Sequence, residues 1–158
     1  MNLQSVRGLA AAGLAIALAA GAAQAETPRA YLFAYHEAGP YGFVDASSVR
    51  PVGGRSEADI LLVAPTAQPA GEKSHMTAHI SMNCQSGQTY ILSGQAYDNS
   101  DAPLGAPRQG SLTSPDDNVG ALDDATRAIV CGGSGAPPEP HRFTTRAAAV
   151  AWVRAGAH

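Results

Sequence analysis

Lysine and cysteine are both scarce in this chain of 158 residues. Lys73 is the only lysine, and the formal net charge is −3. Binding of polyanions depends on many contacts from lysine and arginine. This charge balance therefore argues against nucleic acid and anionic membrane surfaces as partners.

Specific catalytic, cofactor and metal motifs are also missing from the sequence. No serine stands in a G-x-S-x-G pattern, and the glycines around Gly132 are not followed by the lysine of a phosphate-binding loop. Serine, histidine and aspartate occur, but their spacing does not indicate a catalytic site. We predict no catalytic residue, no cofactor and no metal site.

A long uncharged stretch, residues 8–23, follows Arg7 at the N-terminus. It is mostly alanine and glycine, whereas a membrane anchor needs about 20 strongly apolar residues. Ala23 and Ala25 give the small-x-small pattern that signal peptidase cleaves. We predict a signal peptide over residues 1–25, cleavage between Ala25 and Glu26, and no stable membrane insertion afterwards. The protein is then exported, to the periplasm or the cell surface.

Two cysteines, Cys84 and Cys131, follow the predicted cleavage site. Export exposes them to oxidising conditions, in which disulfides persist, and their spacing is far from C-x-x-C. We predict a structural disulfide, with two free thiols as the alternative. In the chain-entropy model, closing a loop of this length stabilises the fold by about 4 kcal/mol.

The apolar pattern predicts an α+β fold. Period-two alternation and short apolar runs indicate about five antiparallel strands, at residues 30–36, 41–45, 58–64, 75–84 and 89–97. Ser114 and Gly132 bound a helix expected to pack on this small sheet. A peripheral C-terminal helix over 146–155 follows a Pro-rich linker. We expect a main domain over 26–133 and a separable segment over 134–158.

The strand over residues 75–84 alternates cleanly, with His75 and His79 on its polar side. Four residues of a strand span about 13 Å, which is too far for two histidines to share a zinc ion. We expect this face to be ordinary solvated surface. Replacing both histidines with glutamine should then change stability by less than about 0.5 kcal/mol.

Residues 98–113 form a long loop rich in Asp, Gly, Pro and Ser. Loops of this length are often functional. Its acidic residues, with Asp116, Asp117, Asp123 and Asp124 after it, could bind calcium, but no complete calcium-loop pattern is present. Turn and capping roles explain them better.

Aromatic residues are concentrated between residues 31 and 43. Aromatic side chains favour recognition surfaces, but they also pack in cores and across strands. We favour core packing for this set, which comprises Tyr31, Phe33, Tyr35, Tyr41 and Phe43.

Three segments resemble the surface-adhesin protein E family. They are FVDASSVRPVGG, MNCQSGQTYILSGQAYDNSDAPLG and DDATRAIVCGG, and the resemblance covers about residues 30–132. The resemblance implies a small antiparallel sheet with a packed helix that ends in the second cysteine. It also implies an envelope or surface protein, since the best known members of the family bind host matrix and plasma proteins.

The sequence therefore predicts an exported, non-catalytic binding protein, adhesin-like, with a protein as the partner. The alternative is a small periplasmic ligand-binding protein or enzyme that uses a cleft beside the 98–113 loop. A deep pocket with convergent polar groups would favour this alternative. An exposed flat apolar patch would favour the protein partner.

Export is expected to yield a mature chain that begins at Glu26, because only small side chains fit the two positions that signal peptidase reads. Intact-mass measurement of the protein recovered from the exported fraction checks this. A mass that retains residues 1–25 would contradict it.

Overall fold

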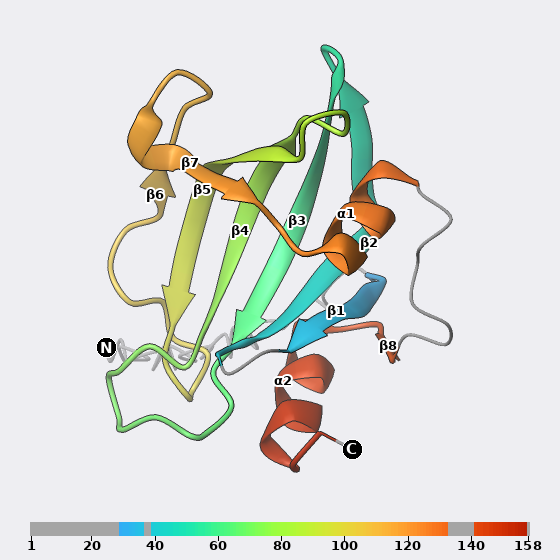
Figure 1. The fold of residues 1–158 in the computed structure, drawn as a ribbon. Helices are drawn as coiled ribbons and strands as arrows, with labels where there is room; N and C mark the ends of the chain where they lie inside the picture. Colours follow the sequence, from blue (N-terminus) through green and yellow to red (C-terminus); the bar gives the residue numbers. More distant parts are fainter. Residues whose placement is uncertain (1–28, 37–38, 133–140, 158) are drawn as a thin grey trace, which may run out of the picture.

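The structure is a computed structural model that describes residues 29–36, 39–132 and 141–157. The predicted signal segment, residues 1–25, and the predicted linker, residues 134–140, lie outside the described residues. Within the described part, an antiparallel sheet of eight strands and two α-helices make up the fold (Figure 1). This architecture agrees with the predicted α+β class.

The elements follow one another as β1 (Tyr31–His36), β2 (Tyr41–Val52), β3 (Arg55–Val63), β4 (His75–Met82), β5 (Gln88–Tyr97), β6 (Arg108–Gln109), β7 (Asn118–Ala121), α1 (Asp124–Cys131), β8 (Arg142–Phe143) and α2 (Arg146–Arg154). The strand order is β6-β5-β4-β3-β2-β1-β8, and β7 also pairs with β5. The expected five strands correspond to β1–β5. The other three have two to four residues, which is too short for alternation to reveal them.

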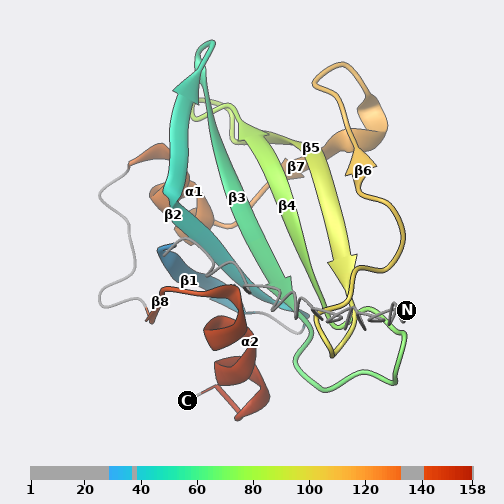
Figure 2. The same cartoon turned by 180° about the vertical axis from the view of Figure 1, so that it is seen from behind.

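The two helices cover opposite faces of the sheet (Figures 1 and 2). Successive side chains of a strand point to opposite faces. Along β3, Ala58 and Ile60 belong to the core under α1, whereas Leu61 and Val63 belong to the core under α2. The sheet therefore has a buried apolar area on both faces.

Only the C-terminal half of the helix predicted after Ser114 is helical in the structure, as α1. The residues before α1 form a short 3-10 turn and β7, and Val119, expected on the apolar stripe of the helix, is 42% exposed. Gly120 has a φ of 74°, a conformation that favours glycine and interrupts a helix. The N-cap is Asp123, whose carboxylate accepts hydrogen bonds from the backbone N–H (2.8 Å) and hydroxyl (2.6 Å) of Thr126.

Strand β2 runs past the predicted strand end at Asp45, because a bulge within the strand lets it continue. The carboxylate of Asp45 accepts hydrogen bonds from the backbone N–H (3.0 Å) and hydroxyl (2.5 Å) of Ser47. The Ser48 hydroxyl accepts a hydrogen bond from the backbone N–H of Asp59 on β3 (2.7 Å). The bulge is thus bonded to the next strand, and pairing resumes at Arg50.

Cys84 and Cys131 form the predicted disulfide. It joins the turn after β4 to the last residue of α1. Arg127 of α1 donates a hydrogen bond to the carbonyl of Cys84 (3.0 Å), and Met82 and Val130 are buried in the core nearby. The covalent link and this core together hold α1 on the sheet.

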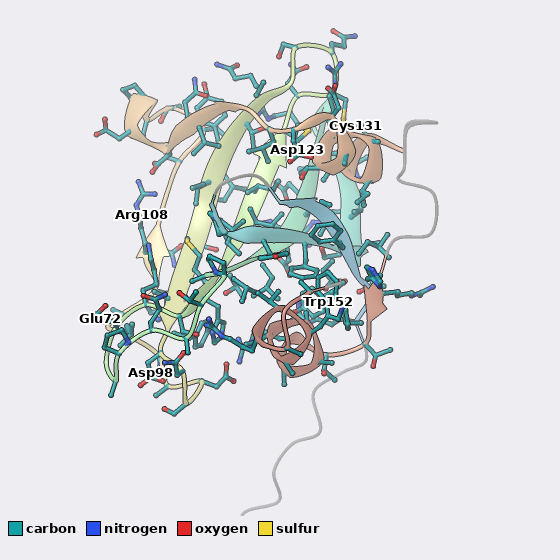
Figure 3. All side chains as sticks on the ribbon, turned by 60° about the horizontal axis from the view of Figure 1, so that its bottom comes forward. Glu72, Asp98, Arg108, Asp123, Cys131 and Trp152 are labelled. Atoms are coloured by element: carbon teal, nitrogen blue, oxygen red, sulfur yellow. A yellow bond between two sulfur atoms is a disulfide. The ribbon has the colours of Figure 1, made fainter. Side chains whose placement is uncertain are left out.

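Helix α2 is not peripheral, which corrects the expectation drawn from the Pro-rich linker. Ala149 and Val153 are fully buried against the sheet, and β8 pairs with β1. Figure 3 shows Trp152 on the side of α2 that faces the sheet. Its ring lies 5.5 to 6.1 Å from four aromatic rings: Phe33, Tyr41, Phe43 and Phe143. Tyr31, Phe33, Tyr41 and Phe43 pack as a core, as predicted, but a distant segment completes that core; the side chain of Tyr35 lies outside the described part.

Replacing Trp152 with alanine is expected to lower the free energy of unfolding by about 3 kcal/mol, because the lost ring leaves a cavity among the aromatic side chains. Ala151→Ser, at an exposed position of the same helix, is the control and should cost about 0.5 kcal/mol or less. Chemical denaturation measures both. A Trp152→Ala variant as stable as the control would restore the view of α2 as a peripheral helix.

Candidate functional site

One row of polar side chains crosses four strands on the face that α2 covers only in part. The register pairs Asp59 of β3 with His79 of β4, His79 with Ser93 of β5, and Ser93 with Gln109 of β6. Paired residues point to the same face. Neighbouring strands lie about 4.8 Å apart, so the row spans about 14 Å. Four residues distant in the sequence therefore form one surface.

A cleft of about 240 Å³ lies along this row. Arg29, just before β1, and Arg146, at the first turn of α2, line it, and Gln109 lies on its β6 side. Gly110 lets this segment approach the sheet closely, because a Cβ there would stand 2.0 Å from a carbonyl oxygen of β5. The cleft thus lies beside the 98–113 segment, where the sequence placed the alternative ligand site.

The charged end of the cleft is built on Asp45, which is 1% exposed. Its carboxylate accepts hydrogen bonds from the backbone N–H of Ala30 (3.2 Å) and from the guanidinium of Arg29 (3.1 Å). Arg29 also donates to Asp59 (3.1 Å). These contacts fix the guanidinium between two carboxylates on β2 and β3.

His79 lies between two carboxylates. Its Nδ1 is 2.8 Å from Asp59, and its Nε2 is 3.2 Å from Glu57. Arg50 donates to Glu57 (2.8 Å); this hydrogen bond lowers the pKa of Glu57 against the opposing effect of burial, and His79 lowers it further. The charged side chains between Arg29 and Arg50 on this face therefore form ion pairs and hydrogen bonds with one another.

The uncharged groups of the cleft are less occupied. Thr77, Ser93 and Gln109 line it and make no side-chain hydrogen bond to any residue that the structure describes. The amide N–H of Gln95 donates to the carbonyl of Ala96 (2.8 Å). Hydroxyl and amide groups supply both donors and acceptors, so this part of the cleft can bond a ligand without giving up bonds within the protein.

A set of buried contacts closes the lower end of the cleft. His75 is 3% exposed and stacks on Tyr97, with ring centroids 5.1 Å apart. Its Nε2 is 2.9 Å from Asp101, and its Nδ1 is 3.3 Å from the hydroxyl of Ser74. Arg146 donates to Asp101 (2.6 Å) and lies over the Tyr97 ring, 4.2 Å from its centroid. The first turn of α2 is thereby held to the loop after β5.

Burial lowers the pKa of His75 below its ordinary value of 6.5, although the hydrogen bond with Asp101 opposes the shift. The neutral ring satisfies both neighbours, because its Nε2–H donates to Asp101 and its Nδ1 accepts from Ser74. Arg154 donates to the hydroxyl oxygen of Ser74 (2.6 Å), which leaves the Ser74 proton for His75.

The expectation that His75 and His79 lie on ordinary surface is wrong. His75 is buried, the His79 side chain is 23% exposed between its two carboxylates, and Ser81 on the same face is 1% exposed. Alternation identifies which side chains share a face of a strand. It does not reveal what segment, here α2 and the loop around Asp101, covers that face.

Of the acidic residues considered for calcium, Asp98, Asp117 and Asp123 have turn and capping roles, as predicted, whereas Asp101 bonds His75 and Arg146. Asp98 accepts from the backbone N–H groups of Ser100 (2.8 Å) and Ala102 (3.0 Å). Asp117 accepts from the backbone N–H of Ser111 (2.7 Å) and from Arg108. Among the described residues, no group of three His, Cys, Asp or Glu is placed to hold a metal ion.

Arg29, Asp59 and Gln109 were not predicted from the sequence as cleft residues. A signal for Asp59 was present, since β3, β4 and β5 each carry polar residues at alternate positions in an otherwise apolar strand. No comparable signal marks Arg29 or Gln109. These residues reach the cleft because β2 places the chain before β1 there and because the 98–113 segment folds back on β5.

Comparison with known proteins returns no match. No family model matches the chain, and neither does any curated protein or solved structure. The resemblance to the surface-adhesin protein E family therefore rests on its three sequence segments alone. Among the residues described, no helix has the length and apolar character needed to cross a membrane.

The free energy of unfolding should fall as the pH drops from about 8 to about 5, in part because of His75. Its pKa in the folded state lies below the ordinary value of 6.5, so the unfolded chain takes up the proton first and is favoured as the pH falls. His75→Gln should be less stable by about 1–3 kcal/mol at the higher pH and should lose part of this pH dependence. Denaturant titrations across this pH range check both expectations. If the free energy of unfolding depended on pH equally in the variant and the wild type, His75 would not be a neutral, buried histidine.

Proposed function

We propose that this protein is an exported, non-catalytic binding protein whose cleft takes a small, uncharged, hydrophilic molecule. The observation that carries the proposal is the polar row of Asp59, His79, Ser93 and Gln109 along a cleft of about 240 Å³. Ligand sites are typically concave, with a few convergent polar groups that fix orientation. This geometry supports the alternative that the sequence raised, a small-ligand cleft beside the 98–113 segment.

The pairing of charges in the cleft argues for an uncharged ligand. Arg29 is bonded to two carboxylates, Arg146 to Asp101, and His79 to Asp59 and Glu57. A charged ligand would have to compete with these partners, at the cost of leaving a partly buried charge without one. In the described part of the chain, the cleft groups without a side-chain hydrogen bond are the hydroxyls of Thr77 and Ser93 and the amide of Gln109, and these can bond a neutral ligand.

The arrangement around Ser93 supports binding without catalysis. A nucleophilic serine needs a base within hydrogen-bond reach. Ser93 is the cross-strand neighbour of His79, but both ring nitrogens of that histidine contact carboxylates, and no hydrogen bond joins the two residues in the described structure. The cleft therefore offers recognition groups and no activated nucleophile.

Export is supported by the predicted signal segment before Glu26 and by the disulfide of Cys84 and Cys131, since such bonds persist in oxidising compartments. We propose the periplasm or the cell surface as the location.

A protein partner is the second candidate, favoured by the resemblance to the surface-adhesin family. Protein interfaces centre on clusters of buried apolar and aromatic anchors. Large apolar side chains exposed by 42–45% in the described structure are Val52, Leu112 and Val119, which is a small set. The cleft has the stronger support.

The test uses ligand-detected NMR on the purified protein. The probes are neutral monosaccharides and disaccharides, with the corresponding sugar acids and amino sugars as charged counterparts. At least one neutral probe should bind, and Gln109→Ala should weaken it by about two- to tenfold, the usual worth of one neutral hydrogen bond. Gln85→Ala makes the same chemical change at an exposed turn outside the cleft and should leave the affinity unchanged.

Binding by charged sugars alone would contradict the proposal, as would equal weakening in the two glutamine variants. If no neutral probe binds and an envelope protein is captured instead, the second candidate is favoured.

A further inference from the structure

A second hollow lies on the opposite face of the sheet from the polar cleft. Along β3, Ile60 and Leu62 point away from the cleft, because they alternate with Asp59 and Leu61. Helix α1 and β7 lie over the upper part of this face (Figure 1). Leu62 and its cross-strand neighbour Met76 remain only half-buried.

Two apolar pockets meet on this face and form what we call the apolar trough. The wider pocket, of about 470 Å³, is lined by Leu62, Ala64 and Met76 among others. The narrower pocket, of about 170 Å³, is lined by Ile60 and Leu122, and both pockets include Pro40 and Leu62. From Ile60 to Ala64 the strand covers about 13 Å. The trough therefore suits an extended apolar chain rather than a compact ring.

The charges at the two ends of the trough differ. Lys73, the only lysine of the chain, lines the wide end, is exposed, and forms no ion pair with any residue the structure describes. At the narrow end, the carboxylate of Asp123 already accepts two hydrogen bonds from Thr126. Figure 3 shows Asp123 well separated from Glu72, the neighbour of Lys73. A single available positive charge thus stands at one end of an apolar trough.

We infer that the trough binds an amphipathic anion, namely a free medium-chain carboxylate with its chain on β3 and its head group at Lys73. Burial of methylene groups against the apolar lining favours binding. The carboxylate stays at the rim in contact with water, so binding does not incur the cost of burying an unpaired charge. This site is distinct from the polar cleft, because its apolar side chains lie on the other face of the sheet and Asp59, His79, Ser93 and Gln109 line neither of its pockets. Ser74 and His75, which help to close the cleft, also line the wider pocket of the trough.

The methionines provide a direct readout. The chain has three, Met1, Met76 and Met82, and predicted export removes the first. Met76 lines the trough, whereas Met82 is fully buried in the core and lines neither of its pockets. In protein labelled with ¹³C at the methionine methyl groups, decanoate below its micellar concentration should shift the Met76 signal saturably and leave the Met82 signal unmoved. Met76→Leu assigns the signals.

Comparison of ligands and variants separates the apolar from the charged contribution. Each further methylene that becomes fully buried should tighten binding by up to about fourfold, so decanoate should bind more tightly than hexanoate. Lys73→Gln should weaken decanoate by about two- to fivefold, the worth of an exposed charge pair, and should leave decanol unaffected. Arg142→Gln, which removes the same charge from an exposed residue outside the trough, is the matched control and should change neither.

Equal shifts of both methionine signals, or shifts that never saturate, would overturn the site, since they indicate nonspecific partitioning. Unchanged decanoate affinity in Lys73→Gln, or equal weakening in Arg142→Gln, would overturn the assignment of the anionic head group. Failure of the neutral-sugar test in the polar cleft would leave this inference standing, because the two sites share no ligand.

Discussion

The alternation of side chains along β3 and β4 places both apolar cores and the polar cleft. These central strands are bonded on both sides, so each residue is committed to one face by its position in the chain. Even-numbered positions such as Ala58 and Ile80 build the core under α1, and odd-numbered positions such as Leu61 build the core under α2. A one-residue shift in register would exchange the two faces and would place Asp59 and His79 in the core under α1.

The polar cleft exists because the apolar covering on the α2 side is incomplete. Helix α2 covers Leu61 and Val63, and the same face continues toward the start of β3 into Asp59 and Glu57, which neither α1 nor α2 covers. Carboxylates on a half-buried sheet face are costly unless they are paired. Here every one of them is bonded to an arginine, a histidine or a backbone N–H. The network fixes the orientation of groups that line the cleft, which is a property expected of a recognition surface.

Helix α2 links the two ends of this arrangement. At its first turn, Arg146 bonds Asp101 and lies over Tyr97. At its last turn, Arg154 bonds the carbonyl of Ala64 and the hydroxyl of Ser74. Between them, Trp152 fills the aromatic core. The Pro-rich composition before the C-terminal segment had predicted that this segment is separable. In the structure it instead completes one core and supports the lower wall of the cleft.

Local periodicity, residue types and the count of cysteines were enough to predict strands β1–β5, the α+β class, the disulfide of Cys84 and Cys131, and the turn role of Asp98. What covers each face of the sheet could not be predicted in this way. That His75 is buried, that Trp152 belongs to a core, and that Asp59 and Gln109 lie in one row across four strands all depend on contacts between distant segments. Such contacts are selected by the packing of whole elements, and alternation within a strand carries no information about them.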